Sequence, residues 1–188
     1  RAVDFTDRAA TEAFAAETAD SEVDILINNA GINKIGPFGQ IEPKDFDRIQ
    51  EVNVRAPFLL CRAVLPAMKR KGWGRIVNIS SIWGKISMAQ RGAYSAGKFA
   101  LDGMTAALAA EVAKYGILAN CVAPGVIDTE LTRTILGEKG ILELTAKIPA
   151  GRLGKPEEIA AFVAWLAGPE NTYISGQNIA IDGGFTRV

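Results

Sequence analysis

The residues best suited to proton transfer in this chain are a tyrosine and a lysine, Tyr94 and Lys98. They lie four positions apart in a segment with helical periodicity, so they share one face of the predicted helix. A tyrosine ordinarily titrates near 10, but a nearby ammonium favours the phenolate and lowers that pKa. The pair can therefore act as a general acid and base. The same spacing is also common on solvent-exposed helix faces.

A serine adds a hydrogen-bonding group to this pair. Ser81 lies thirteen residues before Tyr94 and directly follows a predicted strand, Arg75–Ser80. Its hydroxyl can hydrogen-bond a carbonyl or alcohol oxygen held beside the phenol. The chain contains no histidine, which excludes the Ser-His-Asp triad, the Cys-His pair and every metal site that includes histidine.

The composition is that of an ordinary globular protein of one domain. The chain has 188 residues, 21 basic and 21 acidic side chains and 48% hydrophobic residues. This charge balance predicts neither a nucleic-acid partner nor binding to an anionic membrane. Two cysteines cannot build a disulfide framework or a four-thiolate zinc site, so we expect no metal. The sequence shows no membrane-length apolar run and no signal peptide, which predicts a cytoplasmic protein.

Short apolar β-branched runs alternate with longer helical periodicities along the chain. This alternation predicts a doubly wound, Rossmann-like parallel α/β sheet in a single domain over residues 1–188. We expect both faces of the sheet to be covered, because the strands are apolar nearly throughout. The predicted strands are 23–27, 75–80, 117–123 and 178–181; helices are predicted over 42–68, 93–114 and from about 156, with a less regular stretch at 126–152.

Three polar segments follow predicted strands, namely Asn28–Gly31, Ser80–Ser81 and Pro124–Thr129. In doubly wound folds ligands bind at the carboxyl ends of the strands. The sequence therefore predicts one ligand site at this edge of the sheet.

Taken together, these signatures resemble the short-chain dehydrogenase/reductase family. The segments that carry the resemblance are Asn28-Asn29-Ala30-Gly31, Asn53, Ser81, Tyr94-x-x-x-Lys98, Pro124-Gly125 and Asp182-Gly183-Gly184. The resemblance implies an NAD- or NADP-dependent oxidoreductase that interconverts a carbonyl and a secondary alcohol. The chain is most similar to the 3-oxoacyl-thioester (acyl-carrier-protein) reductases. Sugar or polyol dehydrogenases of the same family are one alternative, and a catalytically silent nucleotide-binding or scaffold protein is another.

The resemblance also implies roles for the catalytic residues. Tyr94 would be the acid in reduction and the base in oxidation, and Ser81 would hold the substrate oxygen. Lys98 would lower the pKa of Tyr94 and hydrogen-bond the nicotinamide ribose. Asn53 would fix a water molecule in a proton relay to Lys98.

A second set of residues is implied to hold the cofactor, beside Tyr94 and Lys98 themselves. Asn29, Ala30 and Gly31 would line its adenosine side, and Asp4 and Phe5 would contact the adenine, although an aspartate after a strand is also an ordinary turn residue. The nicotinamide carboxamide would be held by Pro124, Gly125, Ile127 and Thr129, although Pro-Gly is also a simple turn.

The match to the family is incomplete at the N-terminus. The sequence has no glycine-rich strand–turn–helix loop for the pyrophosphate, and no residue after a second strand to choose between NAD and NADP. Val3 has the character of the end of a strand. We therefore expect an N-terminally incomplete domain that lacks the first two strands of the sheet, which would leave one edge of strand 23–27 bare.

The remaining expectations concern the substrate pocket, the core and assembly. The loop from Glu130 to Arg152 is expected to cover the substrate. Cys61 and Cys121 are expected to be inert core residues. The small residues of helix 93–114 allow close helix approach, and the family resemblance implies a homodimer or homotetramer. Either pocket lining or ordinary packing would account for four further residues: Trp83, Ile86, Met88 and Gln90.

Overall fold

A four-stranded parallel sheet forms the centre of the computed structural model, which describes residues 1–187 and, at Leu131, the backbone only. Its strands are adjacent in sequence order, β1-β2-β3-β4. All three neighbouring pairs are parallel, as predicted. The strands are β1 (Ile25–Asn28), β2 (Gly74–Ile79), β3 (Ile117–Pro124) and β4 (Asn178–Ile181).

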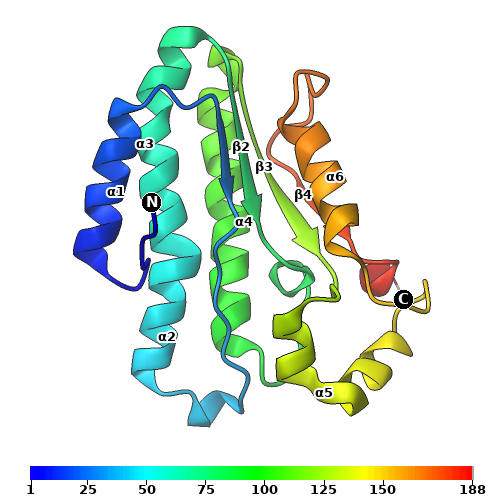
Figure 1. Cartoon of the computed structure of the whole chain (residues 1–188). Coiled ribbons are helices and arrows are strands. Elements are labelled where there is room, and N and C mark those ends of the chain that lie inside the picture. The colour runs from blue at the N-terminus through cyan, green and yellow to red at the C-terminus, as the bar shows by residue number, and fades with distance from the viewer. Residues whose placement is uncertain (188) are drawn as a thin grey trace.

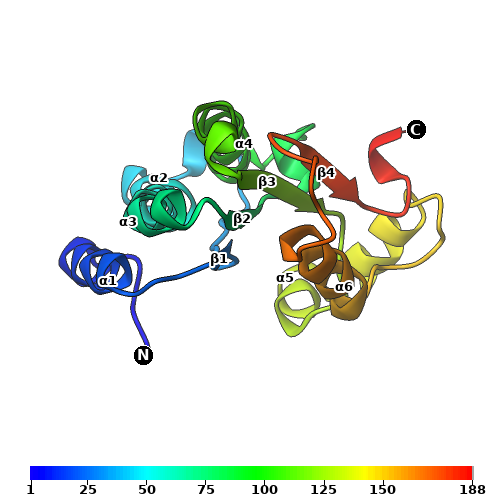
Figure 2. The ribbon, with the colours of Figure 1, turned by 90° about the horizontal axis from the view of Figure 1, so that it is seen from above.

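Helices cover the sheet from both sides, which confirms the doubly wound α/β fold (Figures 1 and 2). On one side lie α1 (Arg8–Asp20), α3 (Ala56–Lys71) and α4 (Gly92–Val112), and on the other lies α6 (Pro156–Ala167). Two further helices, α2 (Pro43–Gln50) and α5 (Glu130–Thr145), lie toward the carboxyl ends of the strands.

Two hydrophobic clusters hold these layers together. The first joins α3 and α4 to the sheet through fully buried side chains such as Val64, Ile76 and Val112. The second packs α6 against the opposite face through residues such as Val77 and Leu166. Both faces of β2 and β3 are therefore covered, as predicted for parallel strands.

A row of polar side chains crosses the sheet inside the first layer. The Asn28 amide donates to the Asn78 side chain at 2.8 Å, and the Asn78 amide donates to the Thr105 hydroxyl at 2.8 Å. Cys121 donates to the same hydroxyl at 3.2 Å, and Cys61 lies 3.5 Å from the Asn28 amide. Burial raises the pKa of both thiols to about 12, so both cysteines are inert core residues as expected.

The long helix predicted from Glu42 is interrupted earlier than expected. A π-helical turn, Glu51–Arg55, separates α2 from α3. Pro57 follows directly after this turn, and the backbone stays helical through the junction, so the missing N–H of Pro57 interrupts the helical hydrogen bonds at this point. The predicted glycine stop is confirmed, because Gly72 ends α3 with a left-handed φ of 67°.

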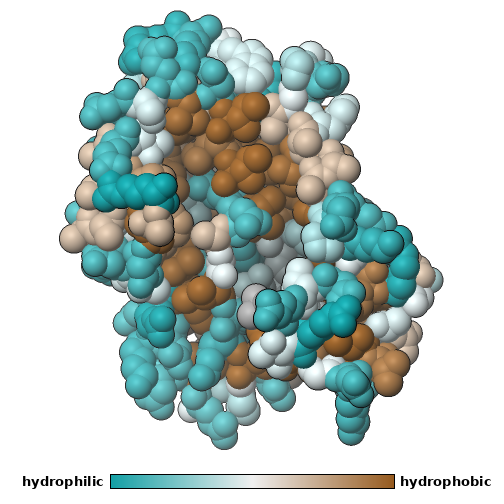
Figure 3. All heavy atoms as spheres, in the orientation of Figure 1, coloured by the Kyte–Doolittle hydropathy of each residue, from teal (hydrophilic) through white to brown (hydrophobic). Residues whose placement is uncertain are grey.

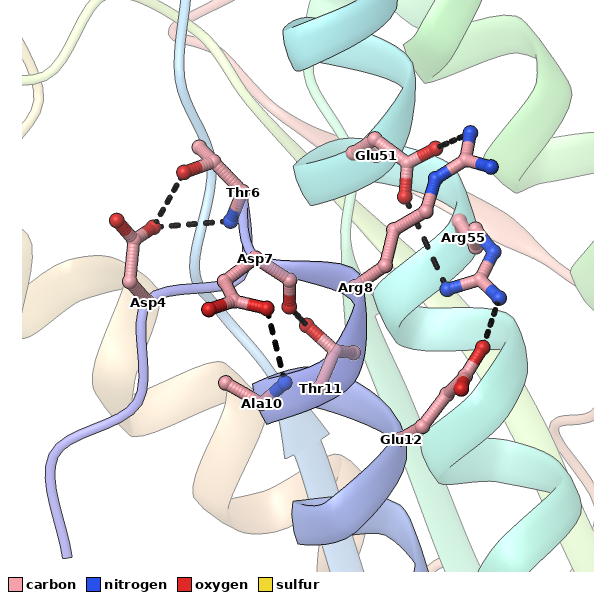
Figure 4. Close-up of polar contacts among 9 residues, drawn as sticks. All are labelled: Asp4, Thr6, Asp7, Arg8, Ala10, Thr11, Glu12, Glu51 and Arg55. Carbon is pink, nitrogen blue, oxygen red and sulfur yellow. Dashed lines mark hydrogen bonds and ion pairs between the residues drawn. The ribbon is translucent and has the colours of Figure 1, made fainter.

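Two predictions of local structure are wrong. The stretch 126–152 contains a regular helix, α5, whose two halves meet at Gly137 in a non-helical conformation (φ 61°, ψ 177°). Residues 1–4 form no strand: the Asp4 carboxylate instead accepts hydrogen bonds from the Thr6 amide and hydroxyl, making a turn into α1 (Figure 4). A strand here would need a neighbouring strand to pair with, and the described residues place none beside it.

The expectation of two covered faces also fails for β1. Leu26 packs into the first cluster, but Ile25 and Ile27 on the opposite face are 44% and 45% exposed. Hydrophobic atoms gather on this face between α1 and α6 (Figure 3). Within the described residues β1 pairs with β2 alone, so its other edge is bare.

This contrast predicts different costs for the same substitution on neighbouring strands. Ile76→Ala removes a fully buried side chain and should lower the free energy of unfolding of the 188-residue chain by about 2–5 kcal/mol. Ile27→Ala, the control on β1, should cost less than about 1 kcal/mol, since half of that side chain already contacts water. Urea denaturation measures both values, and equal losses would contradict the packing described here.

Candidate active site

The carboxyl end of β2 and the first turns of α4 bring the predicted catalytic side chains together. Tyr94 and Lys98 are on the face of α4 that meets the sheet, and Ser81 follows the end of β2. The Lys98 ammonium donates a 2.7 Å hydrogen bond to the Ile79 carbonyl and lies 5.6 Å from the centroid of the Tyr94 ring. The helical spacing read from the sequence thus produces a real contact.

Lys98 is held as a buried cation. Its residue is 3% exposed, and burial lowers the pKa of its ammonium to about 8. At neutral pH the group is still mostly protonated, since this pKa lies above 7. It therefore places a positive charge beside Tyr94.

Tyr94 titrates in the direction opposite to the one predicted. Burial raises the pKa of its phenol above the ordinary value of 10, and a hydrogen bond with Ser81 and the charge of Arg91 act in the other direction. Desolvation of the phenolate outweighs the neighbouring positive charges. At neutral pH the phenol therefore carries its proton and can donate it.

Ser81 is fixed by its own backbone environment. It is 7% exposed and caps a short 3-10 turn, Ile82–Gly84, by accepting a 3.2 Å hydrogen bond from the Trp83 amide. Its hydroxyl also lies close enough to the Tyr94 phenol to act against the rise of that group's pKa. Serine and tyrosine therefore present two hydroxyl groups to the same small volume.

Asn53 lies in the π-helical turn and clamps the loop that follows β1. Its amide oxygen accepts from the Ile32 N–H and its amide nitrogen donates to the Ile32 carbonyl, both at 2.9 Å. The residue is 1% exposed. A Cβ atom placed on Gly31 would lie 3.5 Å from both the Asn53 oxygen and the Lys98 nitrogen, so Gly31 separates these two side chains without filling the space.

A network of charged residues supports the outer side of the same turn (Figure 4). Arg8 of α1 pairs with Glu51, and Arg55 lies 2.5 Å from Glu12 of α1 and 3.8 Å from Glu51. Two residues of the π-helical turn are thus tied to α1. This arrangement holds the backbone that carries Asn53.

A cavity of about 320 Å³ opens in front of these groups, at the carboxyl ends of β1, β2 and β3. Its lining includes nine of the predicted site residues: Asn29, Gly31, Ser81, Tyr94, Lys98, Pro124, Gly125, Ile127 and Thr129. Thr129 also caps α5 by accepting a hydrogen bond from the Thr132 amide. The segments after three strands thus converge as the sequence predicted.

Three predicted cofactor contacts lie outside this cavity. Phe5 and Ala30 line a separate apolar hollow of about 270 Å³ beside β1, which Asn29 also borders. Asp4 is an exposed turn residue occupied by its hydrogen bonds to Thr6. Among the four residues considered for the pocket, Trp83 lines the cavity, and the described lining does not include Ile86, Met88 or Gln90.

Sequence reasoning missed several lining residues. Arg91 lies three positions before Tyr94, so the same helical spacing that paired Tyr94 with Lys98 could have found it. The apolar wall supplied by α5 had no comparable signal, because the stretch was expected to be irregular. Its residues are Thr132, Ile135, Leu136 and Leu144.

The fold and this site define a class of protein: a doubly wound α/β protein with a serine, a tyrosine and a lysine at the carboxyl ends of its strands. Over residues 1–186 the sequence matches the family described as enoyl-(acyl carrier protein) reductase. The chain belongs to the short-chain dehydrogenase/reductase family. In the part of the chain that the structure describes, no helix is long and apolar enough to cross a membrane.

Curated relatives include two bacterial reductases. The 3-oxoacyl-[acyl-carrier-protein] reductase FabG of Vibrio cholerae is 42% identical over 86% of this chain and 66% of its own length. The acetoacetyl-CoA reductase of Cupriavidus necator is 41% identical over 87% of this chain and 66% of its own length. The chain thus spans just under two thirds of the length of these relatives.

Solved structures support the same assignment. A putative NAD(P)-dependent gluconate 5-dehydrogenase from Beutenbergia cavernae with bound NADP superposes with a TM-score of 0.94 at 35% identity, over 98% of this chain and 75% of its own. A gluconate 5-dehydrogenase from Burkholderia cenocepacia in complex with NADP and tartrate gives 0.91 at 33% identity, over 98% and 74%.

The buried charge of Lys98 predicts a pH-dependent stability difference. The pKa is about 8 in the folded chain and 10.5 in the unfolded one, so the unfolded chain binds more protons between these values. The wild-type free energy of unfolding should therefore gain about 3 kcal/mol from this group between pH 7 and 10.5. Lys98→Met lacks this gain, so its stability relative to wild type should fall by that amount over the same range.

Chemical denaturation at pH 7, 8, 9 and 10.5 measures this difference. Lys98→Met also loses the hydrogen bond to Ile79, which changes its free energy of unfolding by the same amount at every pH. This loss therefore does not affect the slope of the free energy of unfolding against pH. Lys147→Met, at an exposed position, is the control and should show no change of slope. A pH-independent difference for Lys98→Met would contradict a lowered pKa.

Proposed function

We propose that the whole protein is an NAD- or NADP-dependent oxidoreductase that interconverts a carbonyl and a secondary alcohol by hydride transfer. The observation that carries this proposal is the convergence of the Ser81 hydroxyl, the Tyr94 phenol and the Lys98 ammonium on one cavity. A catalytically silent scaffold would gain nothing from keeping an ammonium buried, because its desolvation costs stability. The missing pyrophosphate loop is the feature that favours that alternative.

Two substrate classes are supported by the relatives. A 3-oxoacyl thioester is favoured by the likeness to the FabG reductase and the acetoacetyl-CoA reductase. A sugar acid or polyol is favoured by the likeness to the gluconate 5-dehydrogenases. Both classes carry the carbonyl or secondary alcohol that the site would act on.

The residues present fit the nicotinamide half of such a cofactor. Pro124, Gly125 and Ile127 form one wall of the cavity and Asn29 another, with Lys98 between them. Gly31 carries no Cβ, which leaves the space beside the Lys98 nitrogen free for a ribose hydroxyl. When bound, the cofactor supplies or removes the hydride. The 188 residues include no glycine-rich loop for the pyrophosphate.

In the direction of reduction, Ser81 and Tyr94 would donate hydrogen bonds to the substrate carbonyl oxygen. As negative charge develops on that oxygen, Tyr94 would transfer its phenolic proton to it. The raised pKa of Tyr94 supports this role, since the acid form is present at neutral pH. The Lys98 ammonium would then stabilise the phenolate that remains. In oxidation the same proton would move back from the alcohol to Tyr94.

Asn53 would act through the loop it clamps. By holding both backbone groups of Ile32, it fixes the position of Gly31 beside Lys98. A water molecule in a relay to Lys98 would be held by the second N–H or the second lone pair of the Asn53 amide, which Ile32 does not use.

We further propose that residues 1–188 are part of a larger nucleotide-binding domain. The bare edge and exposed face of β1 support this, because parallel strands are normally covered on both faces and edges of apolar strands promote aggregation. A further parallel strand would pair with the edge of β1, and the helix that follows a glycine-rich turn would cover its face. A cytoplasmic location belongs to the same proposal.

The outer face of α4 supports a homo-oligomer, either a dimer or a tetramer. Apart from Phe99 and Glu111, its exposed residues are small: Ala96, Ala100, Gly103, Ala106, Ala107 and Ala110. Light scattering on the complete protein should give at least twice the protomer mass, and Ala100→Glu together with Ala107→Glu should reduce it by burying unpaired charges. A wild-type monomer would contradict this.

The catalytic assignment predicts a selective loss. Tyr94→Phe in the complete protein should lower turnover by at least about 100-fold, because the proton donor is removed, and should leave nucleotide affinity unchanged. The matched control is Tyr173→Phe at a position that is 95% exposed, and its turnover should equal wild type. A panel of acyl thioesters, sugar acids and polyols measures the rates. Undiminished turnover by Tyr94→Phe would refute the role of the phenol.

A further inference from the structure

The cavity in front of Tyr94 contains a second cation that the proposed mechanism does not use. Arg91 lines the cavity and is only 9% exposed. It directly precedes the first residue of α4, three positions before Tyr94, and its side chain lines the same cavity as Tyr94 and Lys98. Burial lowers the pKa of the Arg91 guanidinium, but the group remains charged at any physiological pH.

The Arg91 guanidinium lacks the partners that buried arginines normally have. Its side chain forms no ion pair and no hydrogen bond with any residue that the structure describes. The one charged group that acts on the pKa of Arg91 is Tyr94, which raises it. Arg75, 5% exposed, shows the usual arrangement: it donates to three backbone carbonyls at 2.8–3.2 Å. The Arg91 nitrogens are not among the buried polar atoms that lack a partner, so they reach the cavity and are available to a ligand there.

The Arg91 guanidinium lies beside an aromatic side chain that also lines the cavity. It lies 5.5 Å from the centroid of the Trp83 ring, and that ring packs edge-on against Phe185 at 5.8 Å. The aromatic face supports the cation without using its N–H groups. The residues that line the cavity include no aspartate or glutamate, so Arg91 and Lys98 leave it with uncompensated positive charge.

We propose that Arg91 binds a carboxylate of the substrate, and that the substrate is therefore a hydroxy or oxo acid. This inference rests on the proposed function, since it places the reacting oxygen between Ser81 and Tyr94. The planar fork of a guanidinium matches a carboxylate with two parallel hydrogen bonds. Arg91 lies close enough to Tyr94 for their charges to interact, and both side chains line the same cavity, so the acid group of the substrate would lie near the reacting carbon.

This geometry separates a free acid from a thioester. In an acyl thioester the carboxyl group is masked, and the phosphates of its carrier lie many bonds from the carbonyl. Of the two substrate classes, a sugar acid or a short oxo acid therefore meets the Arg91 requirement. The guanidinium would also exclude the corresponding neutral compounds, because these would bury it without a partner.

The test compares pairs of compounds that differ in one charge. We would measure KM for acetoacetate against ethyl acetoacetate, and for a hexulosonic acid against the ketohexose of the same configuration, with the complete protein. Wild type should favour the charged member of at least one pair. Arg91→Gln should raise its KM by about 10- to 100-fold and change the neutral KM by less than about fivefold. The KM of Arg91→Lys for the charged compound should lie between those of wild type and Arg91→Gln, since lysine keeps the positive charge but cannot form two parallel hydrogen bonds to a carboxylate.

A binding measurement keeps the result independent of turnover. Acetoacetate should quench tryptophan fluorescence in the presence of oxidised cofactor, where no reaction occurs, and Arg91→Gln should weaken this binding by a similar factor. Arg70→Gln is the matched control, because that side chain is 64% exposed and far along α3. It should leave both readouts at wild-type values.

Three outcomes would overturn the proposal. The first is a wild type whose KM shows no preference for the charged compounds. The second is an equal rise of KM for charged and neutral compounds in Arg91→Gln. The third is a rise of KM confined to acetoacetyl-CoA, which would indicate a phosphate contact. Failure of the proposed function is distinguishable from these. In that case Tyr94→Phe would retain turnover while the charge-selective binding by Arg91 persisted.

Discussion

The parallel pairing of β1, β2 and β3 is the constraint on which the site depends. Because all strands run the same way, the segments after them must reach the same edge of the sheet, although they are about 50 residues apart in sequence. Register fixes the alignment further. Asn28 is opposite Asn78, and Asn78 is opposite Cys121, so the buried row of polar side chains can form only if all three strands are in register.

The helix α4 places the catalytic side chains beside the carboxyl ends of the aligned strands. The helix carries Tyr94 and Lys98, Arg91 directly precedes it, and the hydrogen bond from Lys98 to Ile79 ties α4 to the end of β2. A neighbouring glycine permits this close approach: a Cβ atom on Gly84 would lie 2.7 Å from the Lys98 carbonyl. The position of the phenol relative to Ser81 is thus set by packing between a helix and a loop.

The sequence predicted those parts of the molecule that depend on local periodicity. Strand–helix alternation identified the sheet, and the four-residue spacing placed Tyr94 beside Lys98. Long-range packing was not accessible in this way. The direction of the Tyr94 pKa shift follows from burial, which spacing does not report. Likewise, α5 was not predicted because two of its residues are glycines, Gly137 and Gly140, which are weak helix formers. The exposure of Ile27 depends on what lies beside β1.

The absence of histidine gives the cavity an unusual relation to acidity. Between about pH 5 and 7 histidine is the side chain whose ordinary pKa brings a change of charge. Of the titratable groups lining the cavity, Lys98 has a pKa of about 8, the pKa of Tyr94 lies above its ordinary value, and Arg91 is a guanidinium. All three are therefore mostly in one protonation state between pH 5 and 7. The positive charge that the cavity presents to its ligands changes little over that range, so the ionisation of the ligand itself becomes the main source of any response of binding.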